Sequence, residues 1–293
     1  VLRSKGSQAL RPNDVLDEAN SLASEFVRRP NSKYTILTSL SIPSLPFKIH
    51  SYGNISIRSI EPRSPKLELR DGVLGSLPGR FRNHINSSDY CRVRIDVTAR
   101  DAHEAADRGL KAINVVRALW NLILTRGKWS RRIGGAKTDP IGLIHLGPLH
   151  TVYDRSKKSL EDVYWYDPDY VEDCKIHDIG KSWPRIEKDC KYLSRKIRSL
   201  SYRNDIEKVL VRYSAAIDQR SSDLALLQFW GILEYLTCTV GARYDETIRR
   251  AVAPYENRGE EAEFLQVVRI RRNLLVHAAM SGHSSDQVAL AAK

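Results

Sequence analysis

Three polar residues near the carboxyl end of the chain have types and a spacing that could act on a phosphate. Arg272, Asn273 and His277 interrupt the largely apolar stretch of residues 260–280. An imidazole exchanges protons near neutral pH. A guanidinium is always cationic and presents a fork of N–H donors that suits phosphate oxygens. The sequence therefore places a proton carrier and an anion binder within one short segment.

The segment that carries these residues predicts a helix. Asn273 and His277 lie about one turn apart and share a face, whereas Arg272 lies about 140° around the axis from His277. A single helix would place Arg272 and His277 on neighbouring faces, and a two-fold dimer would pool both copies. The apolar residues that we expect to form the core stripe of this helix are Phe264, Val267, Val268, Leu274, Leu275 and Ala278.

The last third of the chain predicts a bundle of helices joined by short turns. The segment LALLQFWGILEYLTCT, residues 224–239, is apolar nearly all the way round, so we expect it at the centre of the bundle or in an interface. Glu234 is the one charged residue within it, and Ser221, Ser222 and Asp223 are expected to cap its N-terminal end. Helices are also expected over residues 205–220 and 245–252, and a final one after Ser284 or Ser285.

The segment from Arg272 to His277, RNLLVH, resembles the R-x-x-x-x-H motif of the HEPN superfamily of ribonucleases, in the version with a polar residue after the arginine. An earlier helix of the form F-W-x-I-L-E-Y-L, which carries Glu234, fits the same pattern. A mixed N-terminal region followed by this bundle is similar in layout to Apea-like HEPN proteins of bacterial phage defence. The resemblance covers roughly residues 202–293.

The resemblance implies a metal-independent endoribonuclease that needs no cofactor and that forms a composite site in a dimer. RNA carries its own nucleophile, the 2′-hydroxyl, so the protein supplies proton transfer and charge stabilisation. His277 would be the general base or acid, and Arg272 would bind the phosphate. Asn273 would orient His277 or bind a phosphate oxygen, and Glu234 would hold Arg272 in a charge-assisted pair. The expected products are a 2′,3′-cyclic phosphate and a 5′-hydroxyl end.

The same residues also have structural interpretations. A histidine at a helix end is often a favourable C-terminal cation, and a glutamate in an apolar helix is usually a paired structural residue. Arg269 and Arg271 either form a solvated face or give RNA a basic rim. Two hypotheses therefore remain. The chain is an endoribonuclease of antiviral, abortive-infection defence that cuts tRNA or mRNA, or it is a non-catalytic HEPN-type module for dimerisation and for RNA or nucleotide binding. A phage-encoded trigger is a further expected partner.

The first half of the chain predicts mixed α and β structure. Asp101 is expected to cap a long helix that ends near Leu124. We expect an α+β protein with two domains, a sensing or regulatory domain over residues 1–185 and the HEPN-like bundle over residues 186–293. The other expected elements are a helix over residues 13–28, which Pro30 ends, and strands near residues 34–42, 51–60 and 92–98.

A basic loop, TRGKWSRRIGGAKTDPIG, follows the long helix. Lys128, Arg131 and Arg132 together with Trp129 suit contacts with phosphates and bases, although a solvated loop remains the alternative interpretation. The segment is not a phosphate-binding P-loop, because Trp129 stands where that motif has Ser or Thr.

The whole chain of 293 residues has 47 basic and 35 acidic residues, a net charge of +12 that favours polyanionic partners such as RNA. No stretch is apolar enough to cross a membrane and no secretory leader opens the chain, so we expect a cytoplasmic protein. Four scattered cysteines do not predict a disulfide scaffold. Cys174, His177 and Cys190 are too few for a closed zinc site, so we expect no metal.

Overall fold

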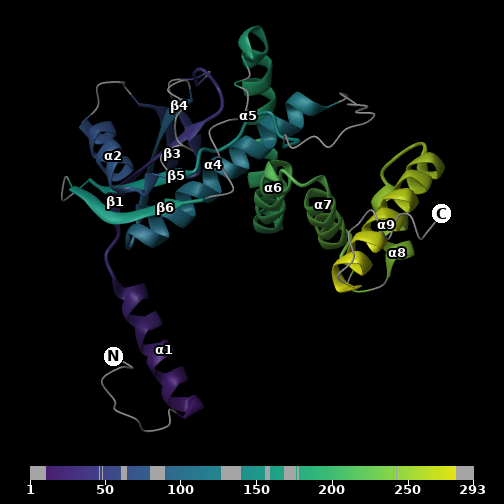
Figure 1. Cartoon of the computed structure of the whole chain (residues 1–293), viewed down its shortest axis with the longest axis horizontal. Helices are drawn as coiled ribbons and strands as arrows, with labels where there is room; N and C mark the ends of the chain where they lie inside the picture. Colours follow the sequence, from purple (N-terminus) through teal and green to yellow (C-terminus); the bar gives the residue numbers. More distant parts are fainter. Residues whose placement is uncertain are drawn as a thin grey trace.

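The chain folds into an antiparallel sheet crossed by one long helix and followed by a series of helices (Figure 1). The computed structural model describes residues 11–45, 47, 49–60, 65–79, 90–126, 140–155, 159–167, 176, 178–239, 241 and 243–281. The predicted α+β class is confirmed. The elements are α1 (Pro12–Arg28), β1 (Ser32–Leu40), β2 (His50–Tyr52), β3 (Ile55–Ser59), α2 (Pro65–Ser76), β4 (Cys91–Ala99), α4 (Ala102–Thr125), β5 (Leu149–Asp154), β6 (Ser159–Tyr166), a 3-10 turn (Gly180–Ser182), α5 (Trp183–Arg198), α6 (Arg203–Asp218), α7 (Ser222–Leu236), α8 (Tyr244–Val252) and α9 (Arg258–Ser281).

The sheet has six strands in the order β2-β3-β4-β1-β5-β6. Its centre is the long antiparallel pair of β1 and β4, whose register runs from Ser32 opposite Ala99 to Leu40 opposite Cys91. Because side chains alternate along a strand, each strand divides its residues between two faces. One face is apolar and packs against α4, and it supplies most of the main core.

Helix α4 forms as the sequence predicts. Asp101 caps it, because its Oδ1 accepts the N–H of Glu104 at 2.8 Å. Small residues bring the helix close to the sheet: a Cβ at Gly109 would lie 2.5 Å from Cδ1 of Ile36. A larger residue here would force the buried Ile36 side chain to move, so glycine favours this close crossing.

Helices α5 and α6 pack against α4 and extend the core of the sheet. Ile186, Cys190 and Leu210 are buried in the same apolar cluster as the strands. The domain boundary predicted at residue 185 falls in the first turn of α5. The side chains just after that boundary thus contribute to the core that holds the sheet.

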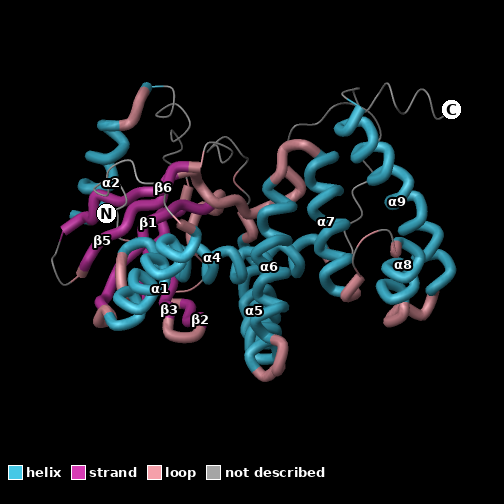
Figure 2. Tube along the Cα trace, turned by 90° about the horizontal axis from the view of Figure 1, so that it is seen from below, coloured by secondary structure: helices cyan, strands magenta, loops and turns pink. Residues whose placement is uncertain are grey.

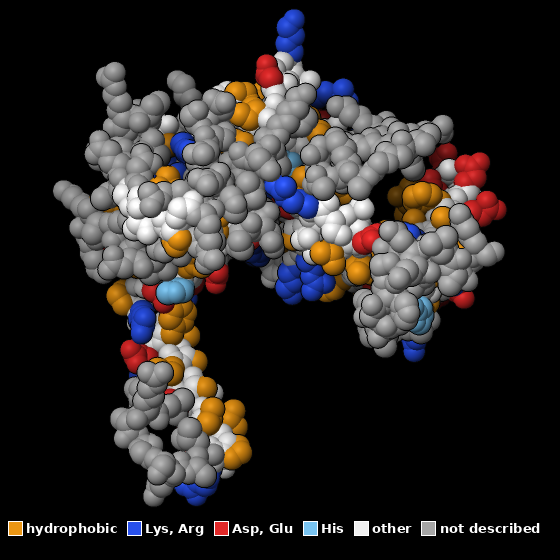
Figure 3. All heavy atoms as spheres, in the orientation of Figure 1, with side chains coloured by type: hydrophobic (Ala, Val, Ile, Leu, Met, Phe, Trp, Pro, Cys, Tyr) orange, Lys and Arg blue, Asp and Glu red, His pale blue; other side chains and the backbone are white. Residues whose placement is uncertain are grey.

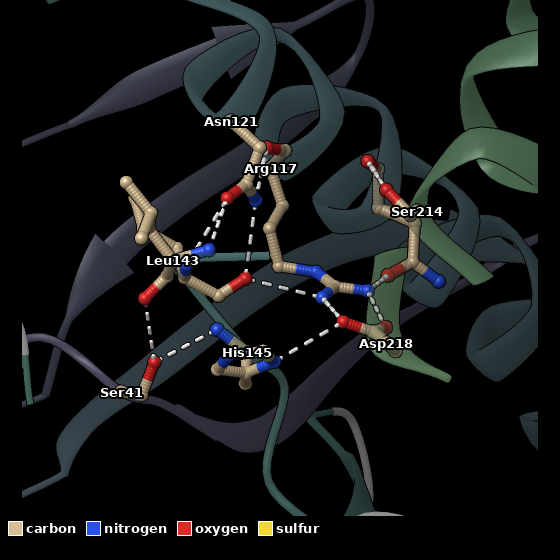
Figure 4. A network of polar contacts seen from close by, with 9 residues as sticks. Ser41, Arg117, Asn121, Leu143, His145, Ser214 and Asp218 are labelled. Atoms are coloured by element: carbon tan, nitrogen blue, oxygen red, sulfur yellow. Dashed lines mark hydrogen bonds and ion pairs between the residues drawn. The ribbon is translucent and has the colours of Figure 1, made fainter. Parts of the chain in front are cut away.

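A buried ion pair joins α4 to the end of α6 (Figure 4). Nη1 and Nη2 of Arg117 each donate to one carboxylate oxygen of Asp218, both at 2.6 Å. Burial alone would raise the pKa of Asp218, but the charge of Arg117 and hydrogen bonds from His145 and Arg117 lower it overall. The buried pair therefore stays ionised and fixes the position of α6.

Asn121 completes this network from the next turn of α4 (Figure 4). Its Oδ1 accepts the N–H groups of Leu143 and Ile144 at 2.7 and 3.1 Å, and its Nδ2 donates to the carbonyl of Ile144 at 3.2 Å. The N–H of Gly142 donates to the carbonyl of Ile217 at 2.9 Å. The segment before β5 is thereby fastened to both α4 and α6.

Helices α7, α8 and α9 lie side by side at the end of the molecule away from the sheet (Figure 2). Ser221 caps α7, as predicted, by accepting the N–H of Leu224 at 3.3 Å. Helix α7 contacts α6, α8 and α9, but it is not enclosed by them, because Leu224 and Leu236 are about half exposed. An interface with another copy stays a prediction for this helix. The helix expected after Ser284 lies outside the described residues.

Helix α1 forms as predicted and extends away from the sheet with its apolar residues uncovered (Figure 3). Val15, Leu16, Leu22 and Val27 are all more than two-fifths exposed. Within the described residues, no helix combines the length and apolar character needed to cross a bilayer.

Candidate functional site

A small apolar cluster holds together α7, α8 and α9, the helix that carries Arg272. Trp230 of α7 and Ile248 and Val252 of α8 are buried in it, and Leu265 and Val268 of α9 pack against them. The α9 residues that face this cluster therefore differ in part from the predicted stripe. The cluster fixes which side of α9 turns inward, and so it positions Arg272.

The core stripe predicted for α9 is partly wrong. Phe264 and Val267 are 50% and 65% exposed, whereas Leu275 is buried and Val268 is half-buried as expected. The side chain of Ala278 lies outside the described part of the chain. Helix α9 carries two apolar stripes, and a periodic pattern does not show which of two stripes packs inward. The second stripe, Phe264, Val267 and Ile270, is left on the surface.

Arg272 is held in place by the first residue of α8. Its Nη1 donates to the hydroxyl of Tyr244 at 2.9 Å, and its guanidinium carbon lies 5.2 Å from the centre of the Tyr244 ring. The same Nη1 donates to Oδ1 of Asn273 at 3.1 Å. Within the described part of the chain, Nε and Nη2 of Arg272 make no hydrogen bond. The protein thus orients one edge of the guanidinium and, within the described residues, leaves the other edge without a hydrogen bond.

Glu234 does not pair with Arg272 in the described structure, which corrects the sequence-based expectation. Its Oε1 accepts the indole N–H of Trp230 at 2.8 Å. The two residues lie one turn apart on α7, and a buried indole N–H needs an acceptor. Trp230 in turn meets the ring of Tyr244, with centroids 6.1 Å apart. Glu234 therefore supports Arg272 only through two intervening aromatic side chains.

Arg269 and Arg271 both form ion pairs within the protomer. Nη1 of Arg269 lies 2.8 Å from Asp245 of α8, and Nη2 of Arg271 lies 3.1 Å from Asp223 of α7. The two pairs fasten α9 to its neighbours. Each arginine keeps part of its side chain exposed, at 28% and 42%. Their predicted contact with RNA stays a prediction.

Asn273 and His277 take different positions on the last turns of α9. Asn273 is half-buried and accepts from Arg272, so it orients the guanidinium. His277 is exposed. The fold thus brings Arg272 and Asn273 together with Tyr244 and leaves the imidazole on the surface further along the helix.

Sequence reasoning missed Tyr244 and Trp230. The spacing of Trp230 and Glu234 is a signal that could have paired them, because residues four apart on a helix are neighbours. No comparable signal exists for Tyr244, which reaches Arg272 from another helix. That contact depends on how α8 packs against α9.

Several other predicted residues lie outside the described part of the chain: Lys128, Arg131, Arg132, Cys174 and His177. Among the residues that the structure describes, no group of three or more His, Cys, Asp or Glu side chains is arranged to hold a metal ion. Cys190 is buried in the main core, and burial raises the pKa of its thiol to about 11. It therefore behaves as a core residue.

Comparison of the chain with protein-family models, curated proteins and solved structures finds no match. The resemblance to HEPN ribonucleases therefore stays a prediction. The reactions that the site could support follow from the side chains of Arg272 and His277. An oriented guanidinium can bind a phosphate through two N–H donors, and an exposed imidazole can carry a proton.

Proposed function

We propose that this chain is a metal-independent endoribonuclease of the HEPN type. The observation that carries the proposal is the geometry of Arg272. Tyr244 and Asn273 orient one of its nitrogens, and the Nε and Nη2 edge makes no hydrogen bond within the described residues. Such an edge matches two oxygens of a phosphate.

In the proposed reaction, His277 removes the proton of an RNA 2′-hydroxyl, and the resulting oxygen attacks the adjacent phosphorus. The bond from phosphorus to the 5′-oxygen breaks, and that oxygen takes up a proton from a second acid. The products are a 2′,3′-cyclic phosphate and a 5′-hydroxyl. Arg272 stabilises the extra negative charge on the phosphorus oxygens as it develops.

The proposal includes a dimer, because the groups of two copies can then face one phosphate. The exposed apolar stripe of α9, Phe264, Val267 and Ile270, supports this part of the proposal. Exposed apolar side chains at helical spacing favour a protein partner. The second copy would supply the acid that protonates the leaving 5′-oxygen.

The biological role that we propose is that of an antiviral, abortive-infection effector in the cytoplasm, with tRNA or mRNA as its substrate. A phage-encoded molecule would trigger the activity through the N-terminal region. The resemblance of the motif to defence ribonucleases supports this role.

To test the proposal, purified wild-type protein is incubated with RNA in the presence of a metal chelator. We expect new cut ends that carry cyclic phosphates. Arg272→Ala and His277→Ala should each lower the cleavage rate about a hundredfold or more. Tyr244→Phe, which keeps the ring but loses the hydroxyl, should lower it by about tenfold. The control is Arg249→Ala, an exposed residue of α8 that pairs with Glu246.

The proposal fails if Arg272→Ala and His277→Ala cut RNA as fast as the wild type does, with melting temperatures that show folded protein. It also fails if cleavage stops when the chelator is added. A wild-type protein that binds RNA without ever cutting it would favour the second hypothesis, a non-catalytic module. The exposed apolar stripe of α9, which suits dimerisation without any chemistry, fits that alternative as well.

A further inference from the structure

Helix α5 has two sides of opposite character. Its apolar residues share one side, which packs in the main core: Trp183, Ile186, Cys190, Leu193 and Ile197. The residues on the other side consequently face away from the core. Helix α5 also projects from the body of the molecule (Figure 2). Its outer side is therefore open to a partner.

Cations dominate the outer side of α5. Four of them, defined here as the basic row, are all exposed: Lys188, Lys191, Arg195 and Arg198. At about 100° per residue, these four positions fall within about 80° of one another around the helix axis. With a rise of about 1.5 Å per residue, the row is about 15 Å long. The helix thus aligns four positive charges along one line.

The acidic residues of α5 neutralise little of the basic row. Glu187 pairs with Lys191 at 2.6 Å. Asp189 lies 4.0 Å from Arg185, which is outside the row. Among the residues that the structure describes, the other three members of the row have no ion-pair partner. Their charges are therefore available to an anion.

Backbone carbonyls of α5 orient the two guanidinium groups of the basic row. Nε of Arg195 donates to the carbonyl of Lys191, and Nε of Arg198 donates to the carbonyl of Ser194, both at 3.3 Å. Within the described residues, the Nη1 and Nη2 atoms of these two arginines make no hydrogen bond. Those N–H groups suit the oxygens of phosphate groups.

Two features of α5 decide between the polyanions that such a row could bind. A helix that binds an anionic membrane buries an apolar face in it, whereas the apolar side of α5 lies in the core. A single nucleic acid strand is held by stacking of its bases on aromatic side chains. Within α5, which the structure describes in full, Tyr192 is the one exposed aromatic residue, and the Nζ atom of Lys196 lies 5.7 Å from the centre of its ring. A duplex needs no stacking, because it is bound mainly through its backbone.

We propose that the basic row of α5 binds the sugar-phosphate backbone of a double-stranded nucleic acid. Its length of about 15 Å spans about four base-pair steps of 3.4 Å, so several phosphates lie within reach of the four cations. The proposal does not rest on ribonuclease activity, because Arg272 and Tyr244 belong to other helices, α9 and α8.

The test measures the fluorescence anisotropy of a short labelled DNA duplex, and of an RNA duplex of the same sequence, on addition of the protein. DNA lacks the 2′-hydroxyl that the proposed cleavage needs, so the DNA duplex stays intact whether or not the protein cuts RNA. Lys188→Ala with Arg195→Ala should weaken binding of the DNA duplex about tenfold and reduce the slope of log affinity against log salt by about 1.8. The RNA duplex should lose affinity to a similar extent.

The matched control is Arg11→Ala with Arg249→Ala, which removes the same charge from two exposed arginines that each pair with an acid three residues away. It should change the affinity by less than about twofold. All four positions are exposed, so both double variants should melt within a few degrees of the wild type.

Four results would overturn the proposal. One is equal weakening by the basic-row pair and the control pair. Another is a wild-type protein that leaves both duplexes unbound at low salt. The third is a single strand of the same sequence that binds as tightly as the duplex. The fourth is competition by vesicles of anionic lipid that is as strong as competition by unlabelled duplex at equal phosphate concentration, since the ligand would then be a membrane surface.

Discussion

Among single residues of this protein, what an arginine side chain can do depends on its hydrogen-bond and ion-pair partners. Arg272 is oriented by a phenol and an amide, so binding of the phosphate that we propose would require little further ordering of its side chain. Arg269 and Arg271, two residues of the same type on the same helix, instead have carboxylate partners that fasten α9 to its neighbours. Arginines that are equivalent in the sequence thus take different roles through their neighbours.

His150, in contrast to these charged arginines, is a titratable side chain that its surroundings keep neutral. It is fully buried, and its Nδ1 lies 2.9 Å from the hydroxyl of Thr38. Burial, together with the charges of Arg70 and Arg117, lowers its pKa from 6.5 to about 3. Below pH 6.5 this histidine binds a proton in the unfolded chain but not in the folded chain. A fall in pH therefore lowers the free energy of unfolding.

We therefore expect the free energy of unfolding to fall by about 2 kcal/mol between pH 7.5 and pH 5 because of His150. Urea unfolding at a series of pH values measures this slope. His150→Asn should flatten it, whereas His103→Asn, a change at an exposed position on α4, should leave it in place. A His150→Asn protein with the full wild-type slope would contradict the assignment to this histidine.

The sequence predicted part of the surroundings of Arg272 and missed the rest for a physical reason. Helix geometry relates the residues of one segment, so the sequence could place Arg272, Asn273 and His277 on one helix, where the structure joins Arg272 to Asn273. The partner proposed for Arg272, Glu234, was wrong, because the real partner, Tyr244, comes from another helix. Contacts between helices depend on packing, which one segment does not encode.

At the scale of elements, helix positions were predicted better than helix faces. The capped start of α4 at Asp101 and the start of α7 at Ser221 follow from local hydrogen bonding, and both were predicted. The inward face of α9 was predicted only in part, because its two apolar stripes satisfy the same spacing. Which stripe turns inward is decided by Trp230 and Ile248, which lie outside that helix.

Gly231 lies in the middle of α7. Glycine weakens a helix interior, and a Cβ at this position would meet no atom within 4 Å. Gly231→Ala should therefore raise the free energy of unfolding by about 0.5–1 kcal/mol, measured as a rise in melting temperature.

The control for Gly231 is Gly109→Ala on α4. There the new Cβ would lie 2.5 Å from Ile36, so the melting temperature should fall. A fall for Gly231→Ala as well would mean that something outside the protomer occupies the space beside α7. In that case the variant should also lose a dimer in sedimentation.

At the scale of the whole molecule, the pair of Arg117 and Asp218 connects the sheet to every helix that follows α6. Arg117 belongs to the helix that crosses the sheet, and Asp218 is the last residue of α6. Both side chains are buried, so removal of one partner would leave an uncompensated charge in the interior. The placement of the candidate site relative to the sheet thus depends in part on this contact.

Asp218→Asn tests this connection, because it removes the charge and keeps the size of the side chain. We expect the free energy of unfolding to fall by about 3–5 kcal/mol. Hydrogen exchange should quicken first in α6, while the amides of β1 and β4 stay protected, since those strands pair with each other. The combined variant Arg117→Met with Asp218→Leu removes both charges and should recover most of the loss. If Asp218→Asn melts at the wild-type temperature, the position of α6 is fixed by apolar packing against α4, and the ion pair is not what joins the two parts.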